Sequence, residues 1–139
     1  PKIWSFVEAA GRGVISMGLV NHYYNYQEVA ANPDTHKALN YSFNDNDIGS
    51  LLVITAATKL ASSENDEAAE DLLAYLLTAP VQQYFTDRTF EYPLAAGVVP
   101  NAALPALTAL EIGSVDFDKL GGGFEEASRI VEASGILNR

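Results

Sequence analysis

The chain has 139 residues, of which 48% are hydrophobic and 19% are charged. This length and composition fit one folded domain with an apolar core and give no indication of intrinsic disorder. Eighteen acidic residues against eight basic ones give a formal net charge of −10, which argues against nucleic acid and anionic membranes as partners, because both attract basic surfaces. There is no cysteine, so disulfides, thiolate metal sites and cysteine nucleophiles are excluded.

The chain begins at Pro1, without an initiator methionine and without the charged and apolar regions of a signal peptide. We therefore expect that its front was removed, or that the sequence is part of a longer protein. Its longest apolar run, residues 51–57, is far too short to cross a bilayer and is typical of a buried strand.

The first part of the sequence predicts a helix, a strand and a second helix. Residues 4–10 carry apolar side chains at helical spacing, and Gly11 and Gly13 end this helix. Residues 14–20 are apolar and β-branched, which predicts a short buried strand. Asn21 is a suitable N-cap for a helix over residues 22–31.

Two further strands are expected in the middle of the chain. Residues 40–43 are a candidate short strand, and residues 48–55 predict a strand that is buried on both faces, because nearly all its side chains are apolar. Residues 44–47 form a polar loop of Asn and Asp between them. This loop lacks the glycine and the closing glutamate of an EF-hand, so we expect no specific calcium site.

The second half predicts three helices. Acidic residues after Ser62 and Ser63 favour a helix start, since negative charge stabilises the N-terminal end. Pro80 ends this helix and begins the next, and a last helix is expected over residues 124–134, closed by Gly135. The first of the three carries an apolar stripe that we expect to be buried: Ala69, Leu72, Leu73, Leu76 and Leu77.

The remaining segments contain no recognisable binding loop. Residues 88–105 hold three prolines and are expected to be irregular. Residues 121–123 are three glycines that lack the lysine of a Walker loop, and they predict a flexible linker. The alternation of strands and helices predicts an α/β protein.

The most unusual segment chemically is residues 21–26, which holds three of the seven tyrosines. Tyr23 and Tyr24 are expected at the start of a helix after a strand, where ligands bind in α/β folds. A phenolate oxygen is a hard anionic ligand that suits a trivalent ion such as Fe³⁺. The phenol pKa is normally about 10, and we expect the helix N-terminus and the metal to lower it. Spacing alone leaves open that both rings are half-buried packing groups.

The neighbours of this pair have several roles available. Asn21 can cap the helix, or it can donate its amide to a small anion at the helix N-terminus. His22 is expected to support the pair without binding the metal. Tyr26 points either into packing or toward the mouth of a cleft, and both possibilities stay open. His36 falls in a loop, where we expect it to be exposed to solvent.

Catalytic motifs are absent from the sequence. There is no Gly-x-Ser-x-Gly elbow, no His-Glu-x-x-His pair and no phosphate-binding loop. The eighteen acidic residues contain no pair in an evident pocket-forming context. The sequence therefore predicts a binding protein and not an enzyme.

Several segments, in order along the chain, resemble the periplasmic ferric-iron-binding proteins that serve bacterial iron(III) ABC importers. Residues 17–24, with the sequence MGLVNHYY, are similar to the segment that carries the tyrosine pair in that family. The similarity begins about halfway along a family member, so the chain resembles the carboxy-terminal portion. It covers nearly the whole chain, and its other segments are residues 47–52, 68–85, 91–94 and 117–120.

This resemblance implies that Tyr23 and Tyr24 bind Fe³⁺ as phenolates and that Asn21 helps to hold a synergistic anion, phosphate or carbonate. It implies a solute receptor without enzymatic activity that docks on an ABC permease. The expected location is the periplasm or, with a lipid anchor, the outside of a Gram-positive cell. The remaining ligands of the family, often a histidine and an acid or a further tyrosine, belong to a first lobe that is largely absent here.

The fold that the resemblance implies is an incomplete type II periplasmic-binding-protein fold of the α/β class. Residues 1–47 correspond to the second lobe with the tyrosine pair, residues 48–105 to a crossover strand and helices that pack on the first lobe, and residues 106–139 to a return to the second lobe. Because residues 48–85 lack that lobe, we expect a homodimer. The alternatives are a structural remnant that binds no metal and self-associates, and a same-fold receptor for another small solute.

Overall fold

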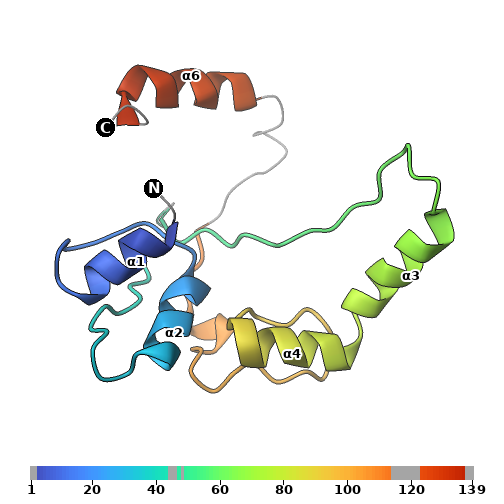
Figure 1. Cartoon of the computed structure of the whole chain (residues 1–139), viewed down its shortest axis with the longest axis horizontal. Helices are drawn as coiled ribbons and strands as arrows, with labels where there is room; N and C mark the ends of the chain where they lie inside the picture. The colour runs from blue at the N-terminus through green and yellow to red at the C-terminus, as the bar shows by residue number, and fades with distance from the viewer. Residues whose placement is uncertain (1–2, 44–46, 48, 114–122, 137–139) are drawn as a thin grey trace. The chain divides into compact units, whose positions relative to one another are not determined.

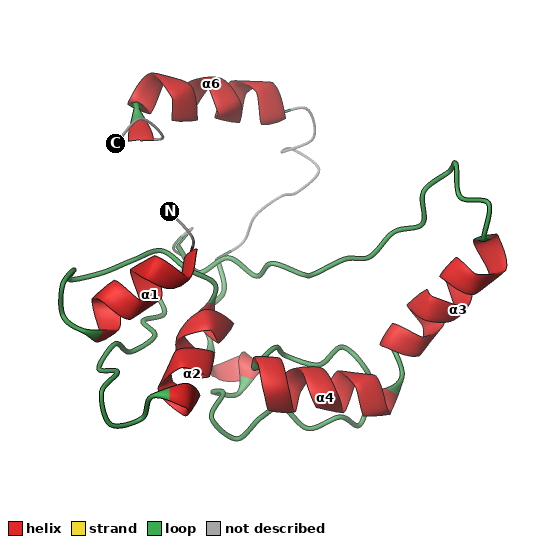
Figure 2. Ribbon diagram, in the orientation of Figure 1, coloured by secondary structure: helices red, strands yellow, loops and turns green. Residues whose placement is uncertain are grey.

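The computed structural model describes residues 3–43, 47, 49–113 and 123–136. Over these residues the chain forms five α-helices and one 3₁₀ helix and contains no β-strand (Figures 1 and 2). None of the helices within these ranges is both long and apolar enough to span a membrane.

The chain divides into two units, each described here by itself. The first comprises Pro1–Ser42 and Val53–Leu110, and the second comprises Phe43–Leu52 and Glu111–Arg139. The first unit contains the tyrosine pair and therefore receives most of the description below.

The first two helices lie where the sequence predicts them. Helix α1 spans Ile3–Gly11 and helix α2 spans His22–Ala31. Asn21 is the N-cap residue of α2 and has an extended backbone, with φ −66° and ψ 140°. The two helices lie side by side (Figure 1), in contact through the rings of Trp4 and Tyr24, whose centroids are 4.9 Å apart in an edge-to-face arrangement.

The next two helices confirm the pair predicted around Pro80. Helix α3 spans Asp66–Leu76 and helix α4 spans Ala79–Thr89. Pro80 lies in the first turn of α4, where its missing N–H has no intrahelical partner to lose. Helix α4 contacts both α2 and α3. It ends at Phe90, which has a left-handed backbone with φ 59° and ψ 32°.

Two further helices, η1 and α6, follow α4 along the chain. Helix η1 is a 3₁₀ turn over Leu107–Ala109, and helix α6 spans Phe124–Ser134. Gly135 ends α6 with a left-handed backbone at φ 66°, as the sequence predicts. Of the predicted glycine linker, residues 121–123, only Gly123 is among the described residues, and it is the N-cap residue of α6.

The three predicted strands are absent from the described residues, so the α/β prediction is wrong for this part of the chain. Residues 14–20 and 40–43 are turns and irregular chain, and residues 51–55 are irregular as well. A strand persists only where a neighbouring strand exchanges backbone hydrogen bonds with it. These segments form no such ladder with any described residue. Their apolar side chains favour burial, but an apolar sequence does not provide the neighbouring strand with which a ladder would form.

The first unit has a small core in which polar side chains outnumber apolar ones. The buried apolar side chains among the described residues are Val7 and Leu104. Because hydrophobic stabilisation scales with buried apolar area, this unit depends strongly on its polar contacts. The buried polar side chains are Asn25, His36, Gln82 and Thr86.

His36 is buried, so the expectation that it would be exposed is wrong. Asn25 donates from Nδ2 to the carbonyl oxygen of Ala38 at 3.2 Å, which leaves Asn25 Oδ1 to accept a hydrogen bond from His36 Nε2 at 2.7 Å. The ring lies against Gly11, where an added Cβ would come within 1.9 Å of His36 Nδ1. Space therefore requires glycine at the end of α1, and the left-handed backbone that follows the helix is at Gly13, with φ 72°.

Buried polar side chains of α4 hold the irregular segment that follows this helix. Gln82 donates from Nε2 to the carbonyl oxygen of Leu76 at 2.9 Å, and its Oε1 accepts from the Leu94 N–H at 2.7 Å. Thr86 Oγ1 accepts from the Asn101 N–H at 2.8 Å. The segment thus follows α4 without any strand pairing.

The described residues of the second unit form a compact turn and helix α6. Asp47 Oδ1 accepts from the Gly49 N–H at 2.6 Å, and Ser50 Oγ donates to the carbonyl oxygen of Phe43 at 2.8 Å. The Gly113 N–H donates to the Ser50 carbonyl oxygen at 2.9 Å. The carboxylate of Asp47 therefore stabilises its own turn, and the other residues of the loop considered for calcium lie outside the described residues.

Candidate metal centre

Tyr23 and Tyr24 lie in the first turn of α2, directly after the N-cap region. Neighbouring side chains on a regular helix diverge by about 100°, yet these two rings converge. Their centroids are 4.5 Å apart and their planes are inclined by 48°. Both side chains are half-buried. The two phenol rings therefore lie together at a place that solvent can still reach.

Asn21 contacts this pair through its amide. Its Nδ2 donates to the hydroxyl oxygen of Tyr23 at 3.1 Å. It makes no side-chain cap hydrogen bond to α2, although its carbonyl oxygen accepts from the Tyr24 N–H at 3.2 Å. Of the two roles that the sequence allows, side-chain capping is therefore not observed, and the amide group lies beside the phenols.

His22 lies within a cluster of aromatic rings beside the pair. Its ring centroid is 5.6 Å from that of Tyr23, 6.2 Å from that of Tyr26 and 5.4 Å from that of Tyr92. Its Nε2 lies 2.9 Å from the carbonyl oxygen of Phe90. A carbonyl oxygen can only accept, so Nε2 carries a proton and donates.

Tyr26 packs within the same cluster. Its ring stacks on that of Phe90, with centroids 5.8 Å apart and planes inclined by 18°. Tyr92 completes the cluster from the segment after α4, and its hydroxyl donates to the carbonyl oxygen of Pro105 at 2.7 Å. Of the two positions that the sequence leaves open for Tyr26, the structure has it packed.

The surroundings of Tyr23 favour its neutral form. Burial raises the pKa of this phenol, and the hydrogen bond and charge of Tyr24 act in the same direction, as does the negative charge of Glu91. The hydrogen bond from Asn21 opposes them. The expected lowering of the phenol pKa at a helix N-terminus therefore does not prevail at Tyr23, and only a cation can drive the proton off near neutral pH.

The surroundings of His22 also favour its neutral form. Burial lowers the pKa of the imidazole, against the opposing effects of its hydrogen bond to Phe90 and the negative charge of Glu91. Without a metal, the site thus presents the neutral phenol of Tyr23 beside a neutral imidazole.

Sequence reasoning missed the residues that surround the pair from other elements. Trp4 comes from α1, and Phe90, Glu91 and Tyr92 follow α4. Nothing in the spacing of residues 21–26 identifies these neighbours, because the contacts depend on how the helices pack.

Two other features of the described residues are separate from the pair. No three side chains of His, Cys, Asp or Glu are grouped closely enough to hold a metal ion. A shallow cavity of about 250 Å³ opens between the end of α1 and the segment after α2, and no tyrosine lines it. Its lining residues are Glu8, Gly11, Arg12, Glu28, Asn32, Thr35 and His36.

Comparison with known proteins gives a consistent set of relatives, although no family model matches the chain. The major ferric iron-binding protein of Neisseria meningitidis is 29% identical over 132 residues, which cover 94% of this chain and 39% of that protein. The Fe(3+)-binding periplasmic protein of Serratia marcescens is 24% identical over 133 residues, with the same coverage. Iron uptake protein A1 of Synechocystis is 23% identical over 134 residues, 93% of this chain and 37% of that protein.

These similarities extend along almost the whole chain. The chain spans about two fifths of the length of the curated relatives that it matches. These relatives are named as iron-binding or iron-uptake proteins, which confirms the prediction of a binding protein and not an enzyme.

Proposed function

Because the homologues of this chain are periplasmic proteins that bind ferric iron, we propose that the chain takes part in binding Fe³⁺ as the solute of a bacterial ABC importer, with Tyr23 and Tyr24 as ligands. The observation that carries the proposal is the convergence of the two phenol rings in the first turn of α2, where their centroids are 4.5 Å apart. Neither observation would be sufficient alone, since tyrosine pairs also occur as packing groups.

The chemistry of two phenols suits this cargo. Phenolate oxygens are hard, charged donors, and they match a small trivalent ion better than a softer divalent one. The raised pKa of Tyr23 means that Fe³⁺ must displace protons when it binds. Bound phenolates then offset part of the charge of the ion within a half-buried site.

Asn21 is proposed to bind the accompanying anion, phosphate or carbonate. Its amide nitrogen already lies 3.1 Å from the Tyr23 hydroxyl oxygen and is not used as a helix cap. The N-terminal end of α2 adds backbone N–H groups and a favourable dipole for an anion. A small anion at this place would fill coordination positions that two phenolates leave open on the ion.

The remaining ligands are proposed to come from outside these 139 residues, since two phenolates do not complete the coordination of Fe³⁺. The same proposal divides the chain at residues 1–47, 48–105 and 106–139, with the middle part facing a lobe of the whole receptor. A periplasmic or lipid-anchored extracellular location and docking on a membrane permease follow from the proposed role, and nucleic acid has no place in it.

Self-association of this chain is a separate part of the proposal. Many large apolar side chains are exposed in the described residues, among them Val53 at 72%, Leu60 at 73% and Leu72 at 56%. Apolar surface on this scale favours burial against a partner. We expect a dimer at micromolar concentration in a sedimentation experiment, and a monomer under those conditions would remove this part.

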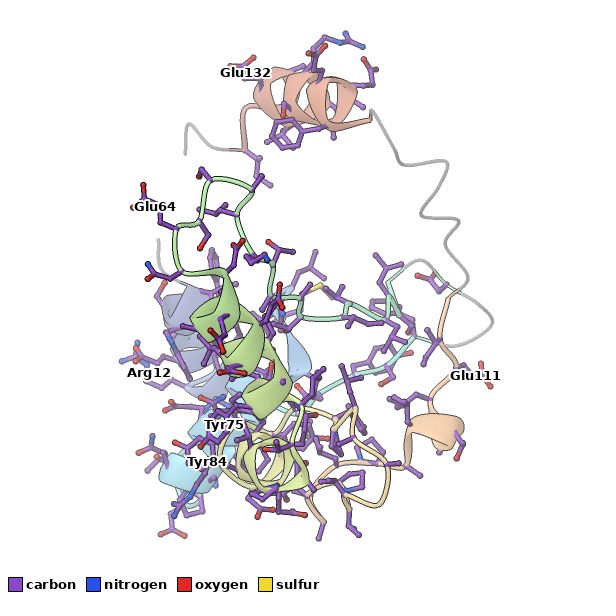
Figure 3. The ribbon with its side chains drawn as sticks, turned by 90° about the vertical axis from the view of Figure 1, so that its right-hand side faces the viewer. Arg12, Glu64, Tyr75, Tyr84, Glu111 and Glu132 are labelled. Carbon is purple, nitrogen blue, oxygen red and sulfur yellow. The ribbon has the colours of Figure 1, made fainter. Side chains whose placement is uncertain are left out.

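A visible charge-transfer band tests the metal site. Ferric citrate added to the chain should give a red or purple colour, which the double variant Tyr23→Phe, Tyr24→Phe should lose. The matched control is the double variant Tyr75→Phe, Tyr84→Phe, because these tyrosines of α3 and α4 (labelled in Figure 3) are exposed at 60% and 59%. Its colour should equal that of the unmodified chain.

The outcomes separate the competing functions. A colour that survives the loss of both proposed ligands would assign the iron elsewhere. A colourless chain would favour the structural remnant, and a colourless longer form carrying a first lobe would favour a receptor for another small solute.

A further inference from the structure

We infer that His22 is a positioning residue for the tyrosine pair, which couples the first turn of α2 to the carboxyl end of α4. The inference rests on the proposed function for its iron-dependent test, but its structural part concerns the chain without metal. It is built from three side-chain hydrogen bonds, one strained backbone position and two ring contacts.

The two hydrogen bonds join α2 to the end of α4. The last carbonyl groups of any helix lack intrahelical partners. At the end of α4, the Phe90 carbonyl oxygen accepts from His22 Nε2 at 2.9 Å, and the Thr89 carbonyl oxygen accepts from Gln27 Nε2 at 3.0 Å. Helix α2 therefore supplies two donors that the end of α4 requires.

Phe90, the residue whose carbonyl oxygen accepts the hydrogen bond from His22, has a strained backbone. Phe90 has φ 59°, in the left-handed region that a residue with a side chain rarely adopts. Stacking of its ring on Tyr26 and the bond from His22 to its carbonyl oxygen both act on this residue. Such a conformation persists where the surroundings fix it.

His22 is itself fixed at both its backbone and its ring. Its carbonyl oxygen accepts from Asn40 Nδ2 at 3.1 Å, while its Nε2 is bound to Phe90. Its ring then meets the ring of Tyr23 edge-on, with centroids 5.6 Å apart and planes inclined by 77°. A ring held in this way limits the rotation of Tyr23, and so keeps its ring against that of Tyr24.

Gln27 provides a matched comparison, because it also bonds from α2 to the end of α4. The side chain of Gln27 makes no ring contact or hydrogen bond with the side chains of the tyrosine pair in the described structure. Loss of the Gln27 bond should weaken the packing of the two helices without disturbing the pair. Loss of His22 should do both.

The test uses three variants of the full chain. His22→Gln keeps an N–H donor at about the reach of Nε2, His22→Leu removes it, and Gln27→Leu removes the neighbouring bond. Outer-shell partners of metal ligands typically change metal affinity about 10–100-fold. We expect His22→Leu to lose at least about tenfold in apparent Fe³⁺ affinity and to shift the charge-transfer band, while Gln27→Leu keeps both and His22→Gln recovers most of the loss.

A second measurement needs no iron. Nuclear Overhauser contacts between the rings of Tyr23 and Tyr24 should be present in the unmodified chain, His22→Gln and Gln27→Leu, and weakened in His22→Leu. Contacts that persist in His22→Leu would overturn the inference, as would equal effects of His22→Leu and Gln27→Leu on the band. A colourless unmodified chain would count against iron binding by this chain alone, and the ring contacts would still decide the role of His22.

Discussion

Helices α2 and α3 both differ from what their apolar patterns predict, because α2 makes more contacts within the chain than expected and α3 is less buried than expected. Helix α2 has little apolar periodicity, yet its polar side chains bond to the segment after it and to the end of α4, through Asn25 and Gln27 for example. Helix α3 has a clear apolar stripe and contains no buried residue, with Leu72 exposed at 56% and Leu77 at 59%. The expected helix is confirmed, and the expected burial of its stripe is wrong.

The difference shows what each kind of pattern specifies. A polar side chain that reaches a particular carbonyl group fixes a position within this chain alone. An apolar stripe specifies only that some surface must cover it, and the surface can come from another part of a protein. Helix α2 is therefore fixed by contacts within this chain, whereas the apolar stripe of α3 would need another surface to cover it.

The largest effect on the free energy of unfolding is expected from Gly11→Ala, which disrupts the contact between α1 and His36. The new Cβ would lie 1.9 Å from His36 Nδ1, so the ring must leave its place and abandon its bond to Asn25. Overpacking costs about 1–3 kcal/mol, and a lost buried hydrogen bond adds about 1–3 kcal/mol. Urea unfolding followed by circular dichroism measures the loss.

Gly18→Ala is the control for this variant, because its Cβ would meet nothing closer than Phe6 at 3.6 Å. Equal stability of Gly11→Ala and Gly18→Ala would show that the site of His36 is not closely packed.

A smaller loss is expected from Thr86→Val, which keeps the shape of a fully buried side chain. The change removes the Oγ1 that accepts from the Asn101 N–H at 2.8 Å. We expect a loss of about 1 kcal/mol, since water can partly replace the acceptor at half-buried Asn101. The same change at exposed Thr58 should leave the unfolding midpoint unchanged, and a similar loss at both positions would contradict the role assigned to the hydroxyl.

A weaker effect is expected from alkaline pH acting on Tyr92. Burial raises the pKa of this phenol, and the charge of Tyr26 adds to the shift. A group whose pKa is higher in the folded chain stabilises it below the unfolded pKa of about 10 and loses that contribution as the pH rises through the folded value. Melting temperatures from pH 8 to 11 should therefore fall more steeply in the unmodified chain than in Tyr92→Phe. Parallel curves would refute this contribution.

The smallest effect is expected from Leu72→Ala on α3. At 56% exposure the side chain has little contact to lose, and surface substitutions usually stay within about 0.5 kcal/mol. Val7→Ala in α1 provides the contrast, because Val7 is 3% exposed. A loss of about 2–5 kcal/mol at Leu72, the size typical of a core leucine, would show that the stripe is covered in solution, and sedimentation of the same samples would reveal whether a second chain covers it.

The helices could be predicted from local signals. Gly11 and Gly135 end α1 and α6, Asn21 precedes α2, and Pro80 begins α4. Each signal depends on the backbone of a few adjacent residues, which the sequence states directly. The tyrosine pair could be singled out in the same way, because three tyrosines lie within four positions.

The features that could not be predicted all depend on contacts between residues that are far apart in the sequence. Residues 14–20 and 51–55 have the composition of strands, but composition does not provide the neighbouring strand. The burial of His36 depends on Asn25 and Gly11, which lie 11 and 25 residues before it. The hydrogen bond between His22 and the Phe90 carbonyl oxygen joins two residues that are 68 positions apart. Spacing within one helix carries no information about such contacts.

The extended run of residues 53–60, drawn as an open trace in Figure 1, bears on the lifetime of the chain. Proteases act on exposed, extended backbone, and the residues from 53 to 59 form no backbone hydrogen bond with any described residue that would first have to break. Cutting there would separate α1 and α2 from α3 and α4 in the sequence. A surface that covers this run would therefore also set how long the chain survives intact.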